Sequence, residues 1–395
     1  MHNVYWKTVK KMKKTTTLIA VVLIIVIVAA IGAYAYLQTQ NAHPHTTLTV
    51  ATTTSLHDTG LEDNGTGNIK DAFQTKYPWI TVNFVALGTG AAIAQAQRGD
   101  ADMILVHSPS QEKTFLAGGY GVDRKIVAYN FFIIVGPPSD PAHISGMSNV
   151  SQALITVYKA AQNDSNIKWV SRNDGSGTNT AEINLWKAAG YNYTQLTSQT
   201  SWFKSTGQGM GASLLVADQL GGYILSDTGT YLAYSNAGNI QLTVTIKAQQ
   251  ALLNVYSAII DNPQNANLTN TNFDAAMTFV NYLVSAEGQQ LLANYGISTY
   301  GQQLFSPFVS LASGTAVNAT LLSWVQNYAY INGTECPATY RYNAGDLYSP
   351  SYDALANSNL GASIDFPNYH STDNQQVTIA VASTQTQNNP KLGKI

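Results

Sequence analysis

Cysteine and charge are both scarce in this chain of 395 residues. Cys336 is the only cysteine, which excludes an internal disulfide framework and a cysteine-ligated metal cluster. Lys, Arg, Asp and Glu together make up 11% of the chain, well below the usual quarter, and the formal net charge is -2. A nucleic-acid partner requires a basic face, so none is expected. Any bound anion must be held by local geometry, because long-range attraction is missing.

The length and the apolar content predict a globular protein of two or three domains. Hydrophobic residues account for 45% of the sequence, which is enough to build substantial cores. Tyr, Thr, Asn and Ser are abundant where Lys and Glu are few, a composition that favours an extracellular protein.

One long apolar run lies near the N-terminus. Residues 18–35 are apolar apart from Gly32 and Tyr34, and they follow five lysines between positions 7 and 14. Such a run is long enough to span a bilayer, and its basic flank is expected on the inside. We expect a cytoplasmic segment at 1–17, a transmembrane anchor at 18–37 and a linker at 38–47. The alternative is a signal peptide that is cleaved after Ala35, which would release the chain.

Predicted strands and helices alternate along most of the chain. The pattern predicts strands at 48–51, 81–87, 101–106, 126–135, 167–170, 201–205, 222–226 and 240–246, and helices at 68–77, 91–97, 111–117, 150–161, 212–220, 273–294 and 321–328. A β-prone run follows at 377–383. This alternation predicts an α/β fold with a parallel sheet.

Five of the predicted strand-to-helix turns are rich in Gly, Ser and Thr. They cover 52–55, 88–90, 172–178, 206–211 and 227–230. Ligands of open parallel sheets bind outside the carboxyl ends of the strands, where these turns would meet. Helix starts offer unpaired N–H groups, glycines permit a close approach, and Arg172 supplies one positive charge. These features favour a negatively charged ligand that accepts hydrogen bonds, without a metal or a cofactor.

Two simpler readings of the 172–178 turn compete with ligand binding. Asp174, Ser176 and Thr178 are residue types that commonly cap a helix start. An enzymatic reading needs a nucleophile beside a base, and no local motif places His57 or His107 next to Ser176. We therefore expect no catalytic residues, and a secreted serine hydrolase remains the remote alternative.

The same turns, in the same order, resemble the tungstate-binding proteins of ABC uptake transporters. The resemblance is carried by Ala51-Thr-Thr-Thr-Ser55, Asp58-Thr-Gly60, Gly88-Thr-Gly90, Gly99-Asp-Ala-Asp102, Val106-His107, Gly119-Tyr-Gly-Val122, Ser171-Arg172, Ser176-Gly-Thr178 and Thr206-Gly-Gln-Gly-Met-Gly211, and it extends from about residue 48 to residue 307. It implies a type II periplasmic-binding-protein fold, in which two lobes and a hinge enclose a ligand cleft. Lobe I would comprise 48–136 and 247–307, lobe II 137–246, and residues 308–395 would form a C-terminal extension without an assigned role.

The resemblance also implies a ligand, a partner and a set of binding residues. The ligand would be tungstate, with molybdate as a second candidate, and it would be delivered to an ABC permease with a cytoplasmic ATPase. The family's binding groups match Thr53, Thr54, Ser55, Thr89, Arg172, Ser176, Gly177 and Thr178.

Several departures from the family pattern leave the choice of anion open. Asn173, Gly175, Asn179 and Thr228 differ from the residues usual in the family, and 172–178 is also similar to the corresponding turn of phosphate-binding proteins. A protonated phosphate needs a buried acceptor, whereas tungstate accepts hydrogen bonds only. The position of Asp174 therefore distinguishes the two: facing the ligand it favours phosphate, and capping the helix it favours tungstate. We expect Asp174 to cap the helix, with a phosphate-binding protein as the alternative.

Overall fold

The computed structural model describes residues 22–34, 36, 44–313, 318–342, 368–371 and 377–380. Residues 22–34 are helical. Among the described residues, no helix is both long and apolar enough to cross a membrane. The predicted cytoplasmic segment, residues 18–21, 35 and 37 of the predicted anchor, most of the predicted linker and much of the C-terminal extension lie outside the described residues.

Ten strands form one sheet, with a separate two-stranded pair near the C-terminus. The strand order in the ten-stranded sheet is β2-β1-β3-β9-β4-β7-β5-β6, and β10 and β8 also pair with β4. The strands are β1 (Thr46–Thr53), β2 (Ile80–Leu87), β3 (Met103–Val106), β4 (Gly121–Gly136), β5 (Trp169–Ser171), β6 (Phe203–Ser205), β7 (Tyr223–Asp227), β8 (Thr243–Ile246), β9 (Leu253–Asp261) and β10 (Ser306–Pro307). The pair consists of β11 (Asn368–Ser371) and β12 (Val377–Ala380).

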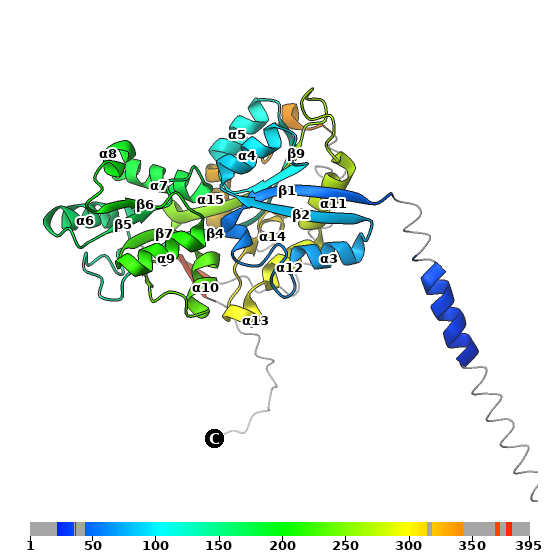
Figure 1. Ribbon diagram of the computed structural model, residues 1–395, viewed down its shortest axis with the longest axis horizontal. Helices are drawn as coiled ribbons and strands as arrows, with labels where there is room; N and C mark the ends of the chain where they lie inside the picture. The colour runs from blue at the N-terminus through cyan, green and yellow to red at the C-terminus, as the bar shows by residue number, and fades with distance from the viewer. Residues whose placement is uncertain are drawn as a thin grey trace, which may run out of the picture.

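The main sheet has two halves that share β4. The first half contains β2, β1, β3 and β9, and the second contains β7, β5, β6 and β8. The early part of β4 pairs with β9, while Phe132 to Val135 pair with β7. Figure 1 shows the elements of the two halves side by side, with β4 passing between them. All 16 residues of β4 are buried.

The prediction of a parallel sheet is correct for the strands that precede most of the helices and wrong for the strands that join the two halves. β1 pairs in parallel with β2 and β3, and β5 pairs in parallel with β6 and β7. β9 runs antiparallel to both β3 and β4, and β4 runs antiparallel to β7 and β8. The sheet is therefore mixed. Strand β9 is missing from the prediction, although the apolar run at 252–260 is a signal for it.

Helices cover both faces of each half. They are α2 (Thr54–His57), α3 (Ile69–Lys76), α4 (Thr89–Gln97), α5 (Pro109–Ala117), α6 (Val150–Asn163), α7 (Gly177–Ala188), α8 (Tyr193–Thr197), α9 (Met210–Leu220), α10 (Thr228–Asn236), α11 (Phe273–Val284), α12 (Ala286–Asn294), α13 (Ile297–Tyr300), α14 (Phe308–Ser313) and α15 (Ala319–Ala329), with short 3-10 turns η1 (Gln250–Leu252) and η2 (Ala338–Tyr340). Separate apolar clusters lie in the two halves, so each half has a core of its own.

The predicted single helix at 273–294 is two helices. Helix α11 ends at Val284, and Ser285 accepts a hydrogen bond from the Gly288 N–H at 3.2 Å as the N-cap of α12. A serine in this position ends one helix and begins the next, because its side chain satisfies a free donor. The apolar periodicity continues across this break, which is why the pattern alone does not reveal it.

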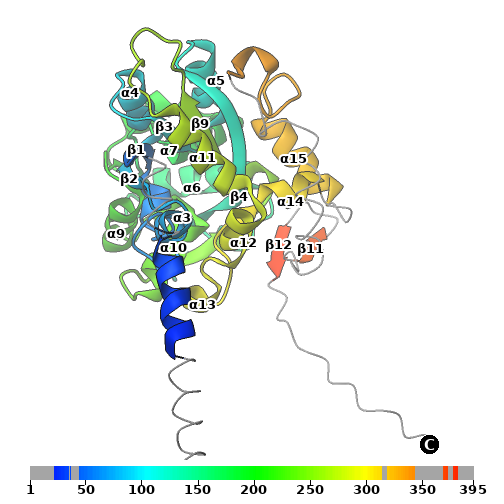
Figure 2. The same cartoon turned by 90° about the vertical axis from the view of Figure 1, so that its right-hand side faces the viewer.

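The C-terminal extension packs against the strands that join the two halves. Phe308, Leu321, Trp324 and Val325 share an apolar cluster with residues of β4 and β9. Figure 2 shows α14 and α15 beside β4. The Glu335 carboxylate accepts from Lys125 Nζ at 2.7 Å and from the Ile126 N–H.

Candidate functional site

All five predicted Gly/Ser/Thr turns connect a strand to a helix, as expected. Their N-cap residues are Thr53 for α2, Gly88 for α4, Ser176 for α7, Gly209 for α9 and Asp227 for α10. The turns of each half lie at the carboxyl ends of its parallel strands. Hydrogen bonds join turns of the first half to turns of the second, so they meet at one place between the halves.

Arg172 is the cation at this meeting point, and it is 2% exposed. Its Nη2 donates to Asp174 Oδ2 at 2.6 Å and to Thr54 Oγ1, in the opposite half, at 3.1 Å. Its Nε also donates to Asp174 Oδ2, at 3.2 Å, and its Nη1 lies 3.5 Å from Thr178 Oγ1. One guanidinium therefore contacts both halves.

The start of α7 lies against the start of α4. The Gly177 N–H donates to Thr89 Oγ1 at 3.0 Å, and the Gly90 N–H donates to the Gly175 carbonyl at 3.3 Å. Gln111 Nε2 donates to the same carbonyl at 3.2 Å. These contacts bring two helix starts together, with their positive dipole ends toward the site.

Asp174 does not cap α7, so that expectation is wrong. Ser176 is the N-cap, and its Oγ accepts from the Asn179 N–H at 3.2 Å. Asp174 Oδ1 accepts from the Ser176 N–H at 3.1 Å, within the turn that precedes the helix, and Oδ2 accepts from Arg172. Ser176 accepts the capping bond with a lone pair, so its own hydroxyl proton remains available for a ligand.

The threonine/serine run leads into a buried histidine. Thr53 Oγ1 lies 3.1 Å from Ser55 Oγ, which lies 3.1 Å from His107 Nε2. His107 Nδ1 lies 2.8 Å from Asn254 Oδ1. Burial, together with the nearby Arg172 charge, lowers the pKa of His107 to about 4, so the imidazole is neutral near pH 7.

The structure brings all eight predicted site residues together. Seven of them are buried: Thr53, Ser55, Thr89, Arg172, Ser176, Gly177 and Thr178; Thr54 is partly buried. We call these eight residues the cradle. The side chains around it are mostly hydrogen-bond donors or hydroxyls, with Asp174 as the carboxylate beside Arg172.

The two halves are closed on each other in this structure. The Gly211 N–H donates to Asp58 Oδ2 at 3.0 Å, and Thr230 Oγ1 donates to the Ser55 carbonyl at 3.2 Å. Burial raises the pKa of Asp58. The hydrogen bond from the Gly211 N–H opposes this shift, because it stabilises the charged carboxylate. These bonds cross from one half to the other, so separating the halves would break them.

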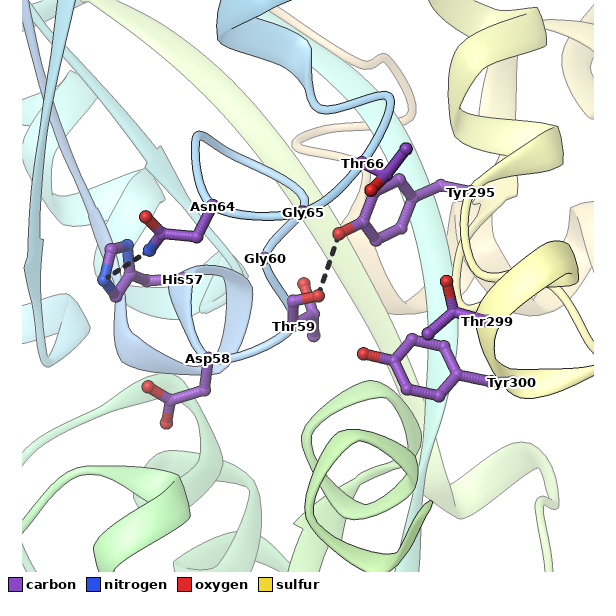
Figure 3. Close-up of a pocket in the computed structure, with 10 residues that line it drawn as sticks. All are labelled: His57, Asp58, Thr59, Gly60, Asn64, Gly65, Thr66, Tyr295, Thr299 and Tyr300. Carbon is purple, nitrogen blue, oxygen red and sulfur yellow. Dashed lines mark hydrogen bonds between the residues drawn. The ribbon is translucent and has the colours of Figure 1, made fainter. Parts of the chain in front are cut away.

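An open pocket of about 490 Å³ lies beside the end of α2. Asp58, Thr59, Tyr295 and Tyr300 are among the residues that line it, and Tyr295 OH donates to the Thr59 carbonyl at 2.9 Å (Figure 3). In this view Asp58 points away from the two tyrosines and toward the second half. The pocket contains none of the cradle residues.

Further polar groups lie behind and beside the cradle: His107 contacts Ser55, Asn254 contacts His107, and Asn130 contacts Asn254. The sequence offers His107 as a candidate base and as part of the family resemblance, and it gives no role to Asn130, Gln111 or Asn254. Asn130 and Asn254 are polar residues flanked by apolar side chains in strands β4 and β9, which is the signal available in the sequence. His107 bonds to Ser55 and not to Ser176, so the pairing that the remote hydrolase alternative would need at Ser176 is not formed. No cluster suited to a metal ion occurs among the described residues.

A buried arginine, hydroxyls and helix starts between two halves of an α/β protein form a geometry suited to a small anion. Comparison with known proteins agrees with this class. Residues 38–287 match the model of the PBP superfamily domain, and the chain therefore belongs to this superfamily of periplasmic-binding-protein-like domains.

Relatives with assigned names extend the comparison. The chain is 42% identical over 251 residues to a putative ABC transporter anion-binding protein of Haloferax volcanii, covering 62% of this chain and 68% of that protein. It is 34% identical over 258 residues to the tungstate-binding protein TupA of Peptoclostridium acidaminophilum, covering 65% of this chain and 84% of that protein. The structure of the tungstate ABC transporter protein from Geobacter sulfurreducens matches with a TM-score of 0.56 and 33% identity, covering 64% of this chain and 100% of that one. These relatives are named for binding and transport, not for catalysis.

Proposed function

We propose that this protein captures a tetrahedral oxyanion, tungstate first and molybdate second, and delivers it to an ABC importer. The observation that carries the proposal is the buried Arg172 guanidinium, which contacts Thr54 of the first half and Thr178 of the second. A ligand bound here would be held by both halves, with the cradle residues as its donors.

Local donors are sufficient for tight binding without a metal. Each hydrogen bond to a charged group contributes about 1.5–3 kcal/mol. A handful of such bonds approaches the roughly 12 kcal/mol of a nanomolar site, before the cost of ordering is subtracted.

The surroundings of Asp174 favour an anion that only accepts hydrogen bonds. Both of its carboxylate oxygens already accept, Oδ1 from the Ser176 N–H and Oδ2 from Arg172. A protonated phosphate would have to compete for this carboxylate, whereas tungstate needs no acceptor. The names of the TupA relatives support the same choice. Phosphate remains the alternative, because a carboxylate beside the cradle still has lone pairs to offer.

The two halves would act as lobes I and II, with the boundaries expected from the sequence except that residues 132–136 of β4 pair with β7 and β8 and so belong with lobe II. β4 and the segment from β8 to β9 connect them, and both cores are separate. Binding would then be coupled to closure, because the ligand and the bonds between the halves form together.

We also propose that the binding domain lies outside the cell, held at the membrane by the apolar run at 18–37, and that it meets the permease there. The run of lysines before it and the low-charge composition after it support this orientation. Protease treatment of intact cells should degrade the binding domain while leaving a cytoplasmic control protein intact. Protection of the domain would contradict the external location.

Calorimetry on the full chain in mild detergent tests the ligand. Titration with tungstate, molybdate, sulfate and phosphate should give tight binding for tungstate and weak or no binding for phosphate. Tight phosphate binding without heat from tungstate would refute the proposal. Arg172→Ala should weaken tungstate binding at least tenfold, whereas Arg98→Ala, at an exposed ion pair, should leave it unchanged.

A further inference from the structure

A chain of hydrogen bonds runs from a backbone carbonyl to the cradle through three buried side chains. Asn130 Nδ2 donates to the Leu304 carbonyl at 3.3 Å, and Asn254 Nδ2 donates to Asn130 Oδ1 at 2.9 Å. Asn254 Oδ1 meets His107 Nδ1 at 2.8 Å, and His107 Nε2 meets Ser55 Oγ at 3.1 Å. Exposure along this chain is 6% for Asn130 and at most 1% for Asn254, His107 and Ser55.

The donor and the acceptor of each hydrogen bond can be assigned by starting from the Leu304 carbonyl. The Leu304 carbonyl can only accept, so the Asn130 amide nitrogen faces it and Asn130 Oδ1 faces Asn254. Asn254 Nδ2 donates to Asn130 Oδ1 and also to Tyr256 OH at 2.9 Å. The Asn254 oxygen is therefore the atom that faces His107, and it accepts a hydrogen bond from the His107 Nδ1–H.

His107 then has no proton on its other nitrogen. A neutral imidazole carries one N–H, and burial keeps this ring neutral by holding its pKa at about 4. The ring cannot turn to exchange its nitrogens, because it stacks on Tyr256 with centroids 5.0 Å apart and lies 6.0 Å from the Phe132 ring. Nε2 therefore accepts, and the Ser55 hydroxyl donates to it.

This direction changes the role of Ser55 in the cradle. Its proton is committed to His107, so its side chain cannot donate to an anion that only accepts. Its remaining lone pairs face Thr53 Oγ1 at 3.1 Å. Resting on the proposed function, we propose that Asn130, Asn254 and His107 form a positioning relay that turns the Ser55 proton away from the oxyanion. Ser55 then accepts a hydrogen bond from the Thr53 hydroxyl, which commits that proton too, and offers the anion only its main-chain N–H at the start of α2.

The tautomer of His107 tests the relay without any ligand. Nitrogen-15 NMR of the uniformly labelled full chain should show a neutral ring that is protonated at Nδ1. In Asn254→Ala the fixed acceptor is gone, and the signals should shift toward the Nε2-protonated form. A wild-type ring that is protonated at Nε2, or at both nitrogens near pH 7, would overturn the relay. This result does not depend on which anion binds, so it can fail while the proposed function stands.

Tungstate affinity of two neighbouring hydroxyl variants tests the consequence. Ser55→Ala removes a hydroxyl that does not donate to the anion, and its dissociation constant should change by no more than about threefold. Thr54→Val removes a hydroxyl that accepts from Arg172 Nη2 and keeps its own proton for the anion, and it should weaken binding at least tenfold. A tenfold loss in Ser55→Ala would overturn the proposal. If neither tungstate nor molybdate binds the wild type, the proposed function fails and the NMR result still decides the relay.

Discussion

Gly177→Ala should weaken anion binding while leaving the fold as stable as before. Gly177 is the first residue of α7, in the second half, and it faces the ring of His107 in the first half. A Cβ at this position would lie 2.9 Å from His107 Cε1, 2.9 Å from Nε2 and 3.0 Å from Cδ2. Ordinary contacts between such atoms are about 3.5–4.0 Å. The clash exists only when the halves are closed, because the two residues belong to different halves.

The ring cannot move aside to relieve this clash. His107 is hydrogen-bonded at both nitrogens, to Ser55 and to Asn254, and it stacks on Tyr256. Overpacking of this kind costs about 1–3 kcal/mol, which corresponds to a loss of affinity of roughly 5- to 150-fold. The open protein avoids this cost. Alanine also favours a helix over glycine by up to about 1 kcal/mol, so the midpoint of thermal unfolding without ligand should be unchanged or higher.

Calorimetry with tungstate and thermal unfolding of the same samples measure the two effects. The matched control compares the double variant Gly177→Ala/His107→Ala with His107→Ala alone. With the ring removed, the added methyl group meets no obstacle and should change the dissociation constant less than twofold. Affinity of Gly177→Ala equal to that of the wild type would refute the reasoning, because the bound state would then not contain this contact. A fall in thermal stability without ligand would also contradict it.

Three further outcomes follow from single side chains. Asp174→Asn should raise the ratio of tungstate to phosphate affinity at least threefold in calorimetry, because it removes a carboxylate that a protonated phosphate could use; an unchanged ratio would mean that Asp174 does not face the ligand. Burial raises the pKa of Glu182 to about 7 from 4.5, so the folded state keeps a proton that the unfolded state loses, and this group's contribution to stability is lost as pH rises from about 4.5 to 7. Urea unfolding of Glu182→Gln at pH 5 and pH 7.5 should therefore show a smaller decline than the wild type, by up to about 2 kcal/mol, and equal declines would contradict the shift. Glu335→Ala removes the carboxylate that accepts from Lys125 and should cost about 3 kcal/mol in denaturant unfolding, whereas Glu287→Ala, at an exposed ion pair, should cost less than about 1 kcal/mol; similar costs would mean that the extension adds little stability.

Local chemistry in the sequence was enough to locate the five turns and Arg172, and the family resemblance selected the cradle residues within them. Each of the five turns places Gly, Ser or Thr where an apolar strand stops, and strand ends on one edge of a parallel sheet must meet. This is why Thr53, Thr89 and Arg172, which lie far apart in the sequence, were predicted together and are found together. Caps are less certain from sequence, because Asp174 and Ser176 are equally suited to the role and only the backbone path selects between them.

The antiparallel strands and the groups behind the cradle depended on the tertiary structure. β9 pairs with β3 and β4, and its direction is set by contacts with residues more than 100 positions away. Periodicity within a short window contains no information about such pairing. The packing of the C-terminal extension on β4 has the same origin.

The sequence by itself determined the α/β class, the five turns and the arginine at their centre, because strand ends, helix starts and charge are local properties of the chain. Only the tertiary structure decided that Ser55 bonds to His107, that Asp174 pairs with Arg172, and that Gly177 must have no side chain. These relations depend on distances of a few tenths of an ångström between segments brought together by folding. Residue types can indicate a donor-rich cradle, but the direction of each proton in it follows from the neighbours that the fold supplies.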